Sequence, residues 1–387
     1  MNQRPIADES LFPQANAVLR DALSSQQIVG AVVLIARDGQ IVHQRAAGWL
    51  DREARRPMRE DAIFRLSSLT KPIVSATALA LVERGVIHLD DTLQRWLPSL
   101  RLRTADGKAA TITLRQLLTH TAGLDYGFFQ TTGGPYHVAR VSDGLADAGL
   151  GIDEQLRRLA AVPLSFAPGT VWRYSVGLDV LGEVLARAAG QTLPALVRRY
   201  VCDPLHMHDT AFTVRDAERL ATPYADGTPP PRMADLHEVT FIEGLAGIRF
   251  APSRIFHSRS YASGGAGMAG SAPDFMRFLL AIANGGGPIL QRESARAMMQ
   301  NQIGPLRIDV EPTRSWGFGF GGAVLLNRDL AGERRSNGTW RWGGVYGHHW
   351  FVDPGRSLAV TVMTNTAMTG MSSRFTEDLQ AAIYAAL

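Results

Sequence analysis

Apolar and polar positions follow the pattern of β-hairpins near both ends of the chain. Residues 30–36 are apolar throughout and lead through Asp38-Gly39 into a second candidate strand beginning at Ile41. Residues 349–352 and 357–366 flank an Asp-Pro-Gly-Arg turn in the same way. Turns of this kind join adjacent antiparallel strands, so both segments are predicted to be hairpins. Amphipathic helices are predicted beside them, at residues 11–23 and 373–387.

The middle of the chain has the apolar spacing of helices instead. Helices are predicted at residues 74–84, 113–122, 175–189 and 272–283. Gly85, Gly123 and Gly190 mark helix ends, and Ser271 with Asp274 resembles a capping box. Two long stretches, 125–150 and 223–260, are rich in glycine, proline and aromatic residues. Connections of this length are usually functional, so we expect them to wall a pocket.

These elements predict an α+β fold with a central antiparallel sheet flanked by helices. Residues 1–73 and 261–387 would build an α/β sheet domain from both chain ends. Residues 74–260 would form a mainly helical inserted domain, with the active site between the two. A length of 387 residues is enough for two or three domains.

Composition excludes several classes of protein. With 45% apolar and 20% charged residues the chain is neither disordered nor fibrous. No apolar run reaches the roughly 18 residues of a membrane-spanning helix, and residues 1–10 lack the apolar core of a secretory signal. The single Cys202 excludes a disulfide framework and favours a reducing compartment, so we expect a cytoplasmic protein without a membrane partner.

Arginine greatly outnumbers lysine among the basic residues. There are 38 arginines but two lysines, Lys71 and Lys108. Coding bias explains the skew as a whole, although it leaves open why lysine is used at those two places. The net charge of +4 is small and the basic residues cluster at most in pairs, so we expect no nucleic-acid partner.

A Ser-x-x-Lys motif stands just before the predicted helix 74–84. Ser68 and Lys71 are spaced i, i+3, which places two side chains on one face of a helical turn. A buried lysine can lose its proton and act as a base, which arginine cannot do. The motif is common by chance, and the alternative is that Ser68 caps the helix and Lys71 is exposed.

Two further motifs carry candidate chemistry. Tyr174 stands just before the predicted helix 175–189, where a buried tyrosine could relay a proton. The alternative is a packed surface tyrosine. Trp342, Gly343 and Gly344 lead into the last hairpin, where paired glycines would let a substrate approach the backbone. The alternative is a bulge or tight turn.

The order of these motifs resembles the serine β-lactamase-like superfamily, which includes class C β-lactamases and D-alanyl-D-alanine peptidases. Connecting segments match as well, namely Leu-Leu-Thr-His-Thr-Ala-Gly-Leu at 117–124, Phe-x-Pro-Gly at 166–169 and Ser-Gly-Gly-Ala-Gly at 263–267. Within this group the chain looks most like the family VIII carboxylesterases. Val176 stands where the lactamases carry an amide-binding asparagine, and Trp342 stands where they carry a lysine that attracts the substrate carboxylate.

The resemblance implies a serine carboxylesterase acting on short-chain esters, with weak β-lactam hydrolysis not excluded. Ser68 would be the nucleophile, Lys71 and Tyr174 would share the proton transfers, and the N–H groups of Ser68 and Val345 would form the oxyanion hole. Tyr126, Trp342, Gly343 and Gly344 would contact a small-molecule substrate. No metal or cofactor is implied, and which of Lys71 or Tyr174 is the principal base stays open, as does the oligomeric state.

Other functions fit the sequence less well. A lactamase, a D-amino-acid peptidase or amidase, or a transesterase could share the same site, and a catalytically silent binding protein could share the fold. No Gly-x-Ser-x-Gly pentapeptide supports an α/β-hydrolase. Adjacent strand residues face opposite ways, so His348 and His349 cannot ligate one metal. We interpret His120 as a structural histidine and Cys202 as a core residue; the remaining metal-ligand candidates are His206, His208 and Asp209.

Overall fold

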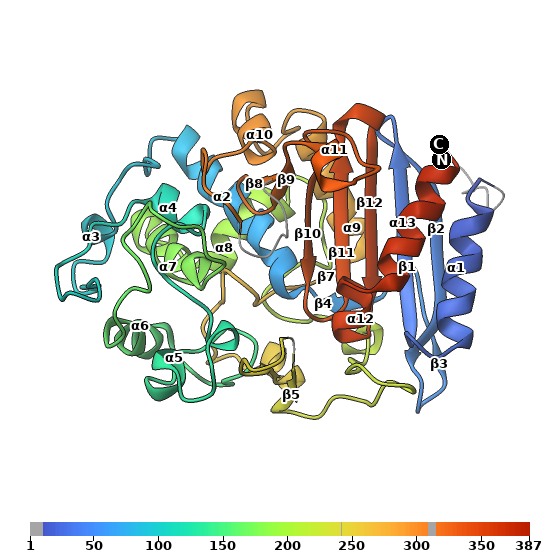
Figure 1. Cartoon of the computed structure of the whole chain (residues 1–387), viewed down its shortest axis with the longest axis horizontal. Helices are drawn as coiled ribbons and strands as arrows, with labels where there is room; N and C mark the ends of the chain where they lie inside the picture. Colours follow the sequence, from blue (N-terminus) through green and yellow to red (C-terminus); the bar gives the residue numbers. More distant parts are fainter. Residues whose placement is uncertain (1–10, 241, 309–314) are drawn as a thin grey trace.

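The computed structural model describes residues 11–240, 242–308 and 315–387 (Figure 1). Residues 1–10, in which no secretory signal is expected, lie outside the described residues. In the described part, no helix is both long and apolar enough to cross a membrane. The main sheet has eight strands in the order β3-β2-β1-β12-β11-β10-β9-β8. These strands are β1 (Gly30–Arg37), β2 (Gln40–Asp51), β3 (Arg56–Pro57), β8 (Trp316–Phe318), β9 (Ala323–Leu325), β10 (Trp340–Gly344), β11 (His348–Asp353) and β12 (Leu358–Thr364).

Every neighbouring pair in this sheet is antiparallel. β1 pairs with β12 from Ala31 opposite Thr364 to Arg37 opposite Leu358, so both predicted hairpins meet at the centre of the sheet. β1 is buried on both faces: Val32 and Leu34 join the main core, whereas Val33 and Ile35 join the core beneath the terminal helices. That two-sided burial is the physical reason for its unbroken apolar run.

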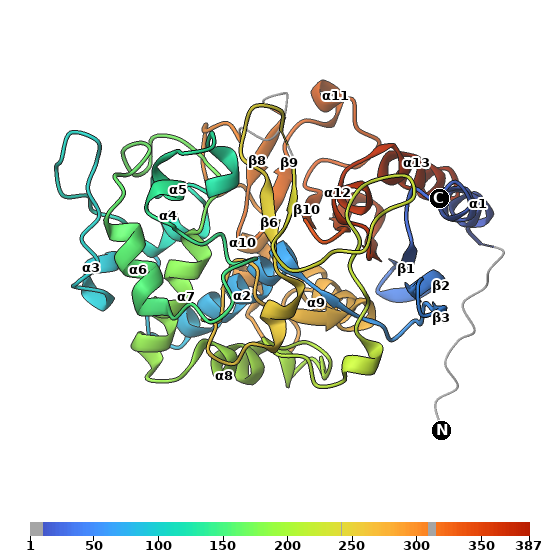
Figure 2. The same cartoon turned by 90° about the horizontal axis from the view of Figure 1, so that it is seen from below.

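Helices cover both faces of the sheet (Figures 1 and 2). α1 (Pro13–Ser24) and α13 (Arg374–Ala385) lie side by side on one face, and α2 (Thr70–Glu83) and α9 (Ala272–Ala283) lie on the other. The remaining helices are α3 (Leu93–Trp96), α4 (Leu114–Leu118), α5 (Pro135–Val138), α6 (Ile152–Ala160), α7 (Gly177–Ala189), α8 (Leu193–Val197), α10 (Arg292–Met298), α11 (Arg328–Ala331) and α12 (Ala367–Met371). α3 to α7 gather away from the sheet on the left of Figure 1.

Short elements complete the described chain. Two further two-stranded sheets pair β4 (Ile63–Arg65) with β7 (Ala269–Ser271) and β5 (His237–Val239) with β6 (Ile248–Phe250). The single-turn helices are η1 (Ser67–Leu69), η2 (Gly127–Phe129), η3 (Arg198–Cys202), η4 (Ala217–Arg219), η5 (Pro252–Phe256) and η6 (Pro354–Arg356). The division into a sheet domain (1–73 with 261–387) and a helical insertion (74–260) stays a prediction.

Two predicted helix ends differ from the structure. The capping box at Ser271 is wrong, since no side-chain bond caps this helix. Asp274 instead accepts hydrogen bonds from the Asp209 N–H at 2.8 Å and the Thr210 hydroxyl at 3.0 Å. α4 has a reciprocal capping box at its start but ends at Leu118, because His120 turns the backbone into the left-handed region at φ 59°.

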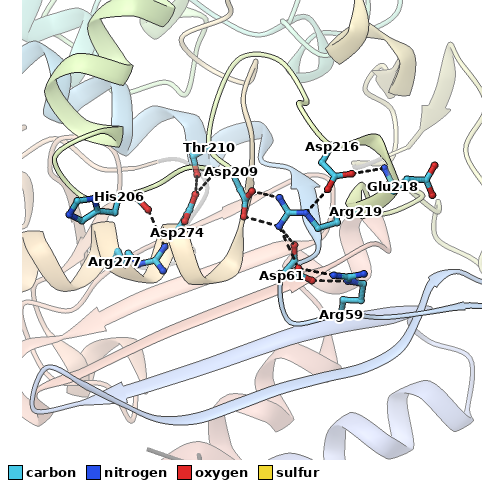
Figure 3. Close-up of polar contacts among 10 residues, drawn as sticks. All are labelled: Arg59, Asp61, His206, Asp209, Thr210, Asp216, Glu218, Arg219, Asp274 and Arg277. Carbon is cyan, nitrogen blue, oxygen red and sulfur yellow. Dashed lines mark hydrogen bonds and ion pairs between the residues drawn. The ribbon is translucent and has the colours of Figure 1, made fainter. Parts of the chain in front are cut away.

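An ionic network joins segments that are distant in sequence (Figure 3). The Arg219 guanidinium donates to Asp216 at 3.0 Å and pairs with Asp61 at 3.5 Å and with Asp209. Asp209 is also bound through its N–H to Asp274 at the start of α9. Arg219 therefore links the loop before β4 to the segment around Asp209, which is in turn bonded to the start of α9.

This network generates a stability prediction. Arg219 is 19% exposed and faces three carboxylates, so Arg219→Ala should lower the free energy of unfolding by about 1.5–3 kcal/mol. Arg59 pairs with the same Asp61 but is 57% exposed, so Arg59→Ala should cost less than about 1 kcal/mol. Urea unfolding of both variants measures the difference. Equal losses in the free energy of unfolding would show that Arg219 does not contribute more to stability than the exposed Arg59.

Candidate active site

Ser68 lies where the chain turns sharply into α2. It belongs to η1, and the preceding Ser67 has a left-handed φ of 44°, which is unusual for a residue other than glycine. Ser68 is 8% exposed and lines a cavity of about 760 Å³. A local backbone turn thus presents one serine hydroxyl to the cavity, while Ser67 is fully buried.

Lys71 lies one turn further on and is fully buried. Its Nζ is 3.3 Å from Ser68 Oγ and donates to the Gly265 carbonyl at 2.9 Å. The amine also lies 4.4 Å from the centre of the Tyr174 ring. Burial lowers the pKa of Lys71 to about 7, although Asp179 and Asp143 raise it in part. The alternative of an exposed lysine is wrong.

Tyr174 completes the cluster from the segment before α7. Its hydroxyl accepts a hydrogen bond from the indole Nε1–H of Trp342 at 3.0 Å, and an interaction with the Ser68 hydroxyl lowers the pKa of Tyr174 in part. Burial raises the pKa of Tyr174 above its usual range, and the side chain is 7% exposed. The alternative of a surface tyrosine is therefore wrong.

The cavity beside Ser68 has an aromatic wall. Tyr126, Trp342, Gly343 and Val345 line it, as the predicted site requires. Further lining residues come from both long stretches singled out in the sequence, namely Phe128 and Phe129 from the first and Ile248 from the second. These two stretches therefore do wall a pocket.

Gly344 has a different place from the one predicted. It is buried and is not among the residues that line the cavity. A Cβ at Gly344 would lie 2.6 Å from Ser67 Oγ and 2.8 Å from the Leu66 carbonyl. The absence of a side chain lets β10 pack directly against the turn that carries Ser68, which brings Val345 close to it. Gly344 thus allows close packing of β10 on this turn, and its contact with substrate stays a prediction.

Sequence reasoning missed two groups around Lys71. Asp179 is 2% exposed, and burial raises its pKa although the Ser263 hydroxyl and the Gly265 N–H lower it in part. A Cβ at Gly265 would lie 2.7 Å from Asp179 and 3.4 Å from Lys71 Nζ, so this glycine leaves room for both. An acid within the apolar stretch Gly-Leu-Asp-Val-Leu was the available signal for Asp179. For the Gly265 carbonyl, the sequence offered no signal beyond the Ser-Gly-Gly-Ala-Gly motif in which it lies.

Three of the histidines singled out in the sequence make polar contacts inside the protein, whereas His206 and His208 are exposed. His120 Nδ1 lies 3.2 Å from both the hydroxyl and the N–H of Ser175, consistent with a structural role. His348 Nε2 contacts the Arg65 carbonyl at 2.9 Å, and His349 Nδ1 contacts the Gly370 carbonyl at 3.1 Å. Within the described ranges no group of three or more potential ligands gathers as a metal site. Cys202 is buried, as expected of a core residue.

Comparisons with known proteins find a matching family and several similar proteins. The Beta-lactamase family model matches residues 15–385. The chain is 49% identical over 381 residues to Esterase EstB of Burkholderia gladioli, covering 97% of this chain and 96% of that protein. It is 30% identical to Monacolin J acid methylbutanoyltransferase of Aspergillus terreus over 384 residues, covering 88% of this chain and 87% of that protein.

A solved structure is also similar. EstCE1, described as a hydrolase with promiscuous acyltransferase activity, superposes with a TM-score of 0.94 at 42% identity and covers 98% of this chain and 100% of that chain. The resemblance to family VIII carboxylesterases, and the α+β fold that it implied, are confirmed by these similarities. The chain belongs to the β-lactamase family.

Proposed function

We propose that the protein is a serine carboxylesterase that hydrolyses short-chain esters through an acyl-enzyme on Ser68. The observation that carries the proposal is the series of polar contacts that links Trp342, Tyr174, Ser68 and Lys71, beside a cavity with several aromatic residues in its wall. The similarity to Esterase EstB and to the hydrolase EstCE1 supports the same activity.

The direction of the hydrogen bonds assigns the proton donors. An indole nitrogen can only donate, so the Tyr174 oxygen accepts from Trp342 and its own proton is free to point at Ser68. The Ser68 proton then points at Lys71 Nζ when that amine is neutral. Attack on an ester carbonyl passes the Ser68 proton to Lys71, and Tyr174 donates its own proton to the departing alkoxide. The Lys71 ammonium then returns a proton to the Tyr174 phenolate, which restores both groups for the second step.

The charge states favour the same roles. With its pKa near 7, Lys71 is largely neutral in mildly alkaline solution and can accept a proton. The raised pKa of Tyr174 keeps its phenol protonated and suited to act as an acid. We therefore assign Lys71 as the general base and Tyr174 as the proton relay. In the second step water attacks the acyl-enzyme and gives a proton to the neutral Lys71 amine, which passes it to Ser68 Oγ as the acid leaves.

The N–H groups of Ser68 and Val345 are proposed as the oxyanion hole. Both residues line the cavity, and the close packing of Gly344 on Leu66 and Ser67 supports their proximity. Donors of this kind contribute about 2.7–4 kcal/mol each in other hydrolases. The residues would then stabilise the negative charge of both tetrahedral intermediates.

The residues that line the cavity indicate which chemical groups a substrate can place there. Tyr126, Phe128 and Trp342 provide apolar surface, which suits hydrocarbon acyl or alcohol groups and discriminates weakly between them. Acyl transfer to an alcohol is the second candidate activity, because EstCE1 and the Aspergillus terreus relative carry it in their descriptions. Weak β-lactam hydrolysis and the cytoplasmic location stay predictions.

Ser68→Ala should abolish ester hydrolysis, whereas Ser67→Ala should retain most of it because Ser67 is buried away from the cavity. Assays with p-nitrophenyl acetate measure both variants. Mass spectrometry after exposure to an alkyl phosphonate should find one adduct, on Ser68. An adduct elsewhere, or a fully active Ser68→Ala variant, would refute the proposed nucleophile.

The pH dependence follows from Lys71. Activity requires its neutral form, so kcat/KM should fall below an apparent pKa near 7 as the amine becomes protonated. Lys71→Arg keeps the charge but cannot release a proton at these pH values, and should lose about a thousandfold or more in kcat/KM. A folded and active arginine variant would contradict the base role.

Trp342→Phe keeps an aromatic wall but removes the donor to Tyr174. With the hydroxyl no longer oriented, kcat for p-nitrophenyl acetate should fall by about tenfold while KM changes little. Steady-state kinetics measures the change in kcat and the change in KM separately. A rise in KM at constant kcat would mean that Trp342 acts only as substrate-binding surface.

A further inference from the structure

One short turn carries three of the aromatic residues that line the catalytic cavity, namely Tyr126, Phe128 and Phe129. Tyr126 immediately precedes η2, and its ring stacks on Phe128 with centroids 4.6 Å apart. Phe128 contacts Phe129 at 4.7 Å, so the three rings form one continuous surface. The Tyr126 ring also lies 5.2 Å from Lys71 Nζ and 5.2 Å from the Tyr174 ring. The position of this turn therefore affects both the width of the cavity and the surroundings of Lys71.

Side chains from outside the turn bind both backbone polar groups of Gly127. Its N–H donates to Asp143 Oδ1 at 2.7 Å, and its carbonyl lies 2.9 Å from His137 Nε2. A carbonyl can only accept, so Nε2 of His137 carries a proton in this contact. A Cβ at Gly127 would lie 3.1 Å from Asp143 Oδ2, so the carboxylate is packed directly against the backbone.

The Asp143 carboxylate interacts with two successive backbone N–H groups of this turn. Besides the Gly127 N–H, the Phe128 N–H also stabilises its charged form. Burial nevertheless raises the pKa of Asp143 to about 7, and the neighbouring carboxylates Asp147 and Asp125 raise it further. When the Asp143 carboxylate is charged, its hydrogen bond to Gly127 contributes more than one between neutral groups, and it is then the stronger of the two anchors.

A second cavity lies behind the turn. It has a volume of about 420 Å³, and its lining includes Gly127, His137 and Asp143. Phe128 and Phe129, which follow Gly127 directly, line the catalytic cavity instead. The turn thus lies between two cavities, and on the side of the second cavity the Asp143 side chain packs against Gly127. Within the turn the Gly127 carbonyl also accepts from the Gln130 N–H at 2.9 Å, whereas the contacts with Asp143 and His137 join Gly127 to later segments of the chain.

We propose that Asp143 and His137 are positioning residues that set the width of the catalytic cavity, and with it the size of the ester accepted, by anchoring Gly127. The inference rests on the proposed esterase function. With both anchors in place, the aromatic wall bounds the catalytic cavity on this side and limits the chain length that it accepts. Without them, the turn has room to retreat into the second cavity and admits longer chains.

Substrate selectivity tests this role. The ratio of kcat/KM for p-nitrophenyl octanoate to that for the acetate should rise about tenfold in Asp143→Ala, mainly through a lower KM for the octanoate. Asp143→Asn keeps an acceptor for the Gly127 N–H and should stay within about twofold of the original ratio. His137→Ala should shift the ratio in the same direction by a smaller factor.

The matched control is Asp147→Asn. Asp147 lines the same cavity but does not bond to Gly127 among the described contacts, and asparagine tolerates its left-handed φ of 46°. This variant should leave the ratio unchanged. An unchanged ratio in Asp143→Ala, an asparagine variant that behaves like alanine, or a control that shifts equally would each overturn the proposal.

Hydrogen exchange tests the anchor without using catalysis. The Gly127 amide should exchange at least about tenfold faster in Asp143→Ala than in the unmodified protein, while the β1 amides keep their protection. Unchanged exchange at Gly127 would overturn the anchor whatever the kinetics show. Faster exchange in a protein that hydrolyses no ester would instead refute the proposed function and leave the anchor standing.

Discussion

The complete burial of the Lys71 amine is the constraint on which the rest of the site depends. An ammonium ion removed from water is costly unless its surroundings compensate. Here the Gly265 carbonyl, the Tyr174 ring and the nearby Asp179 provide partial compensation. The balance leaves a pKa of about 7, so the amine changes charge near neutral pH. More complete compensation would keep it permanently charged and useless as a base.

The sheet holds the parts of the site in register. β9 pairs with β10 at Trp340 and Arg341, and the next residue along that edge is Trp342, which reaches Tyr174. Gly344, two residues further, lets the same strand pack against the turn before Ser68. One strand near the C-terminus therefore positions both a donor to the relay tyrosine and the segment next to the nucleophile. A rigid sheet edge suits this task because small displacements weaken proton transfer.

The aromatic wall and the catalytic groups are coupled through buried charge. Asp143 accepts from Gly127 in the wall, and its carboxylate also raises the pKa of Lys71. Burial works against ionisation of both Asp143 and Asp179, so each carboxylate destabilises the folded state when it is charged. Such groups persist where function requires them, and here they lie within reach of the base.

The sequence by itself determined the hairpins, the terminal helices and the candidates Ser68, Lys71 and Tyr174. Each of these depends on local signals, namely the apolar period, turn residues and a motif with fixed spacing. Tertiary structure alone decided that Lys71 is buried, that Trp342 bonds to Tyr174, and that Gly344 packs against the nucleophile turn. Tertiary structure alone also brought Asp179, Asp143 and the Gly265 carbonyl into the surroundings of Lys71. The physical reason is that pKa values, hydrogen-bond partners and cavity walls depend on desolvation and on neighbours from distant segments, which no local pattern encodes.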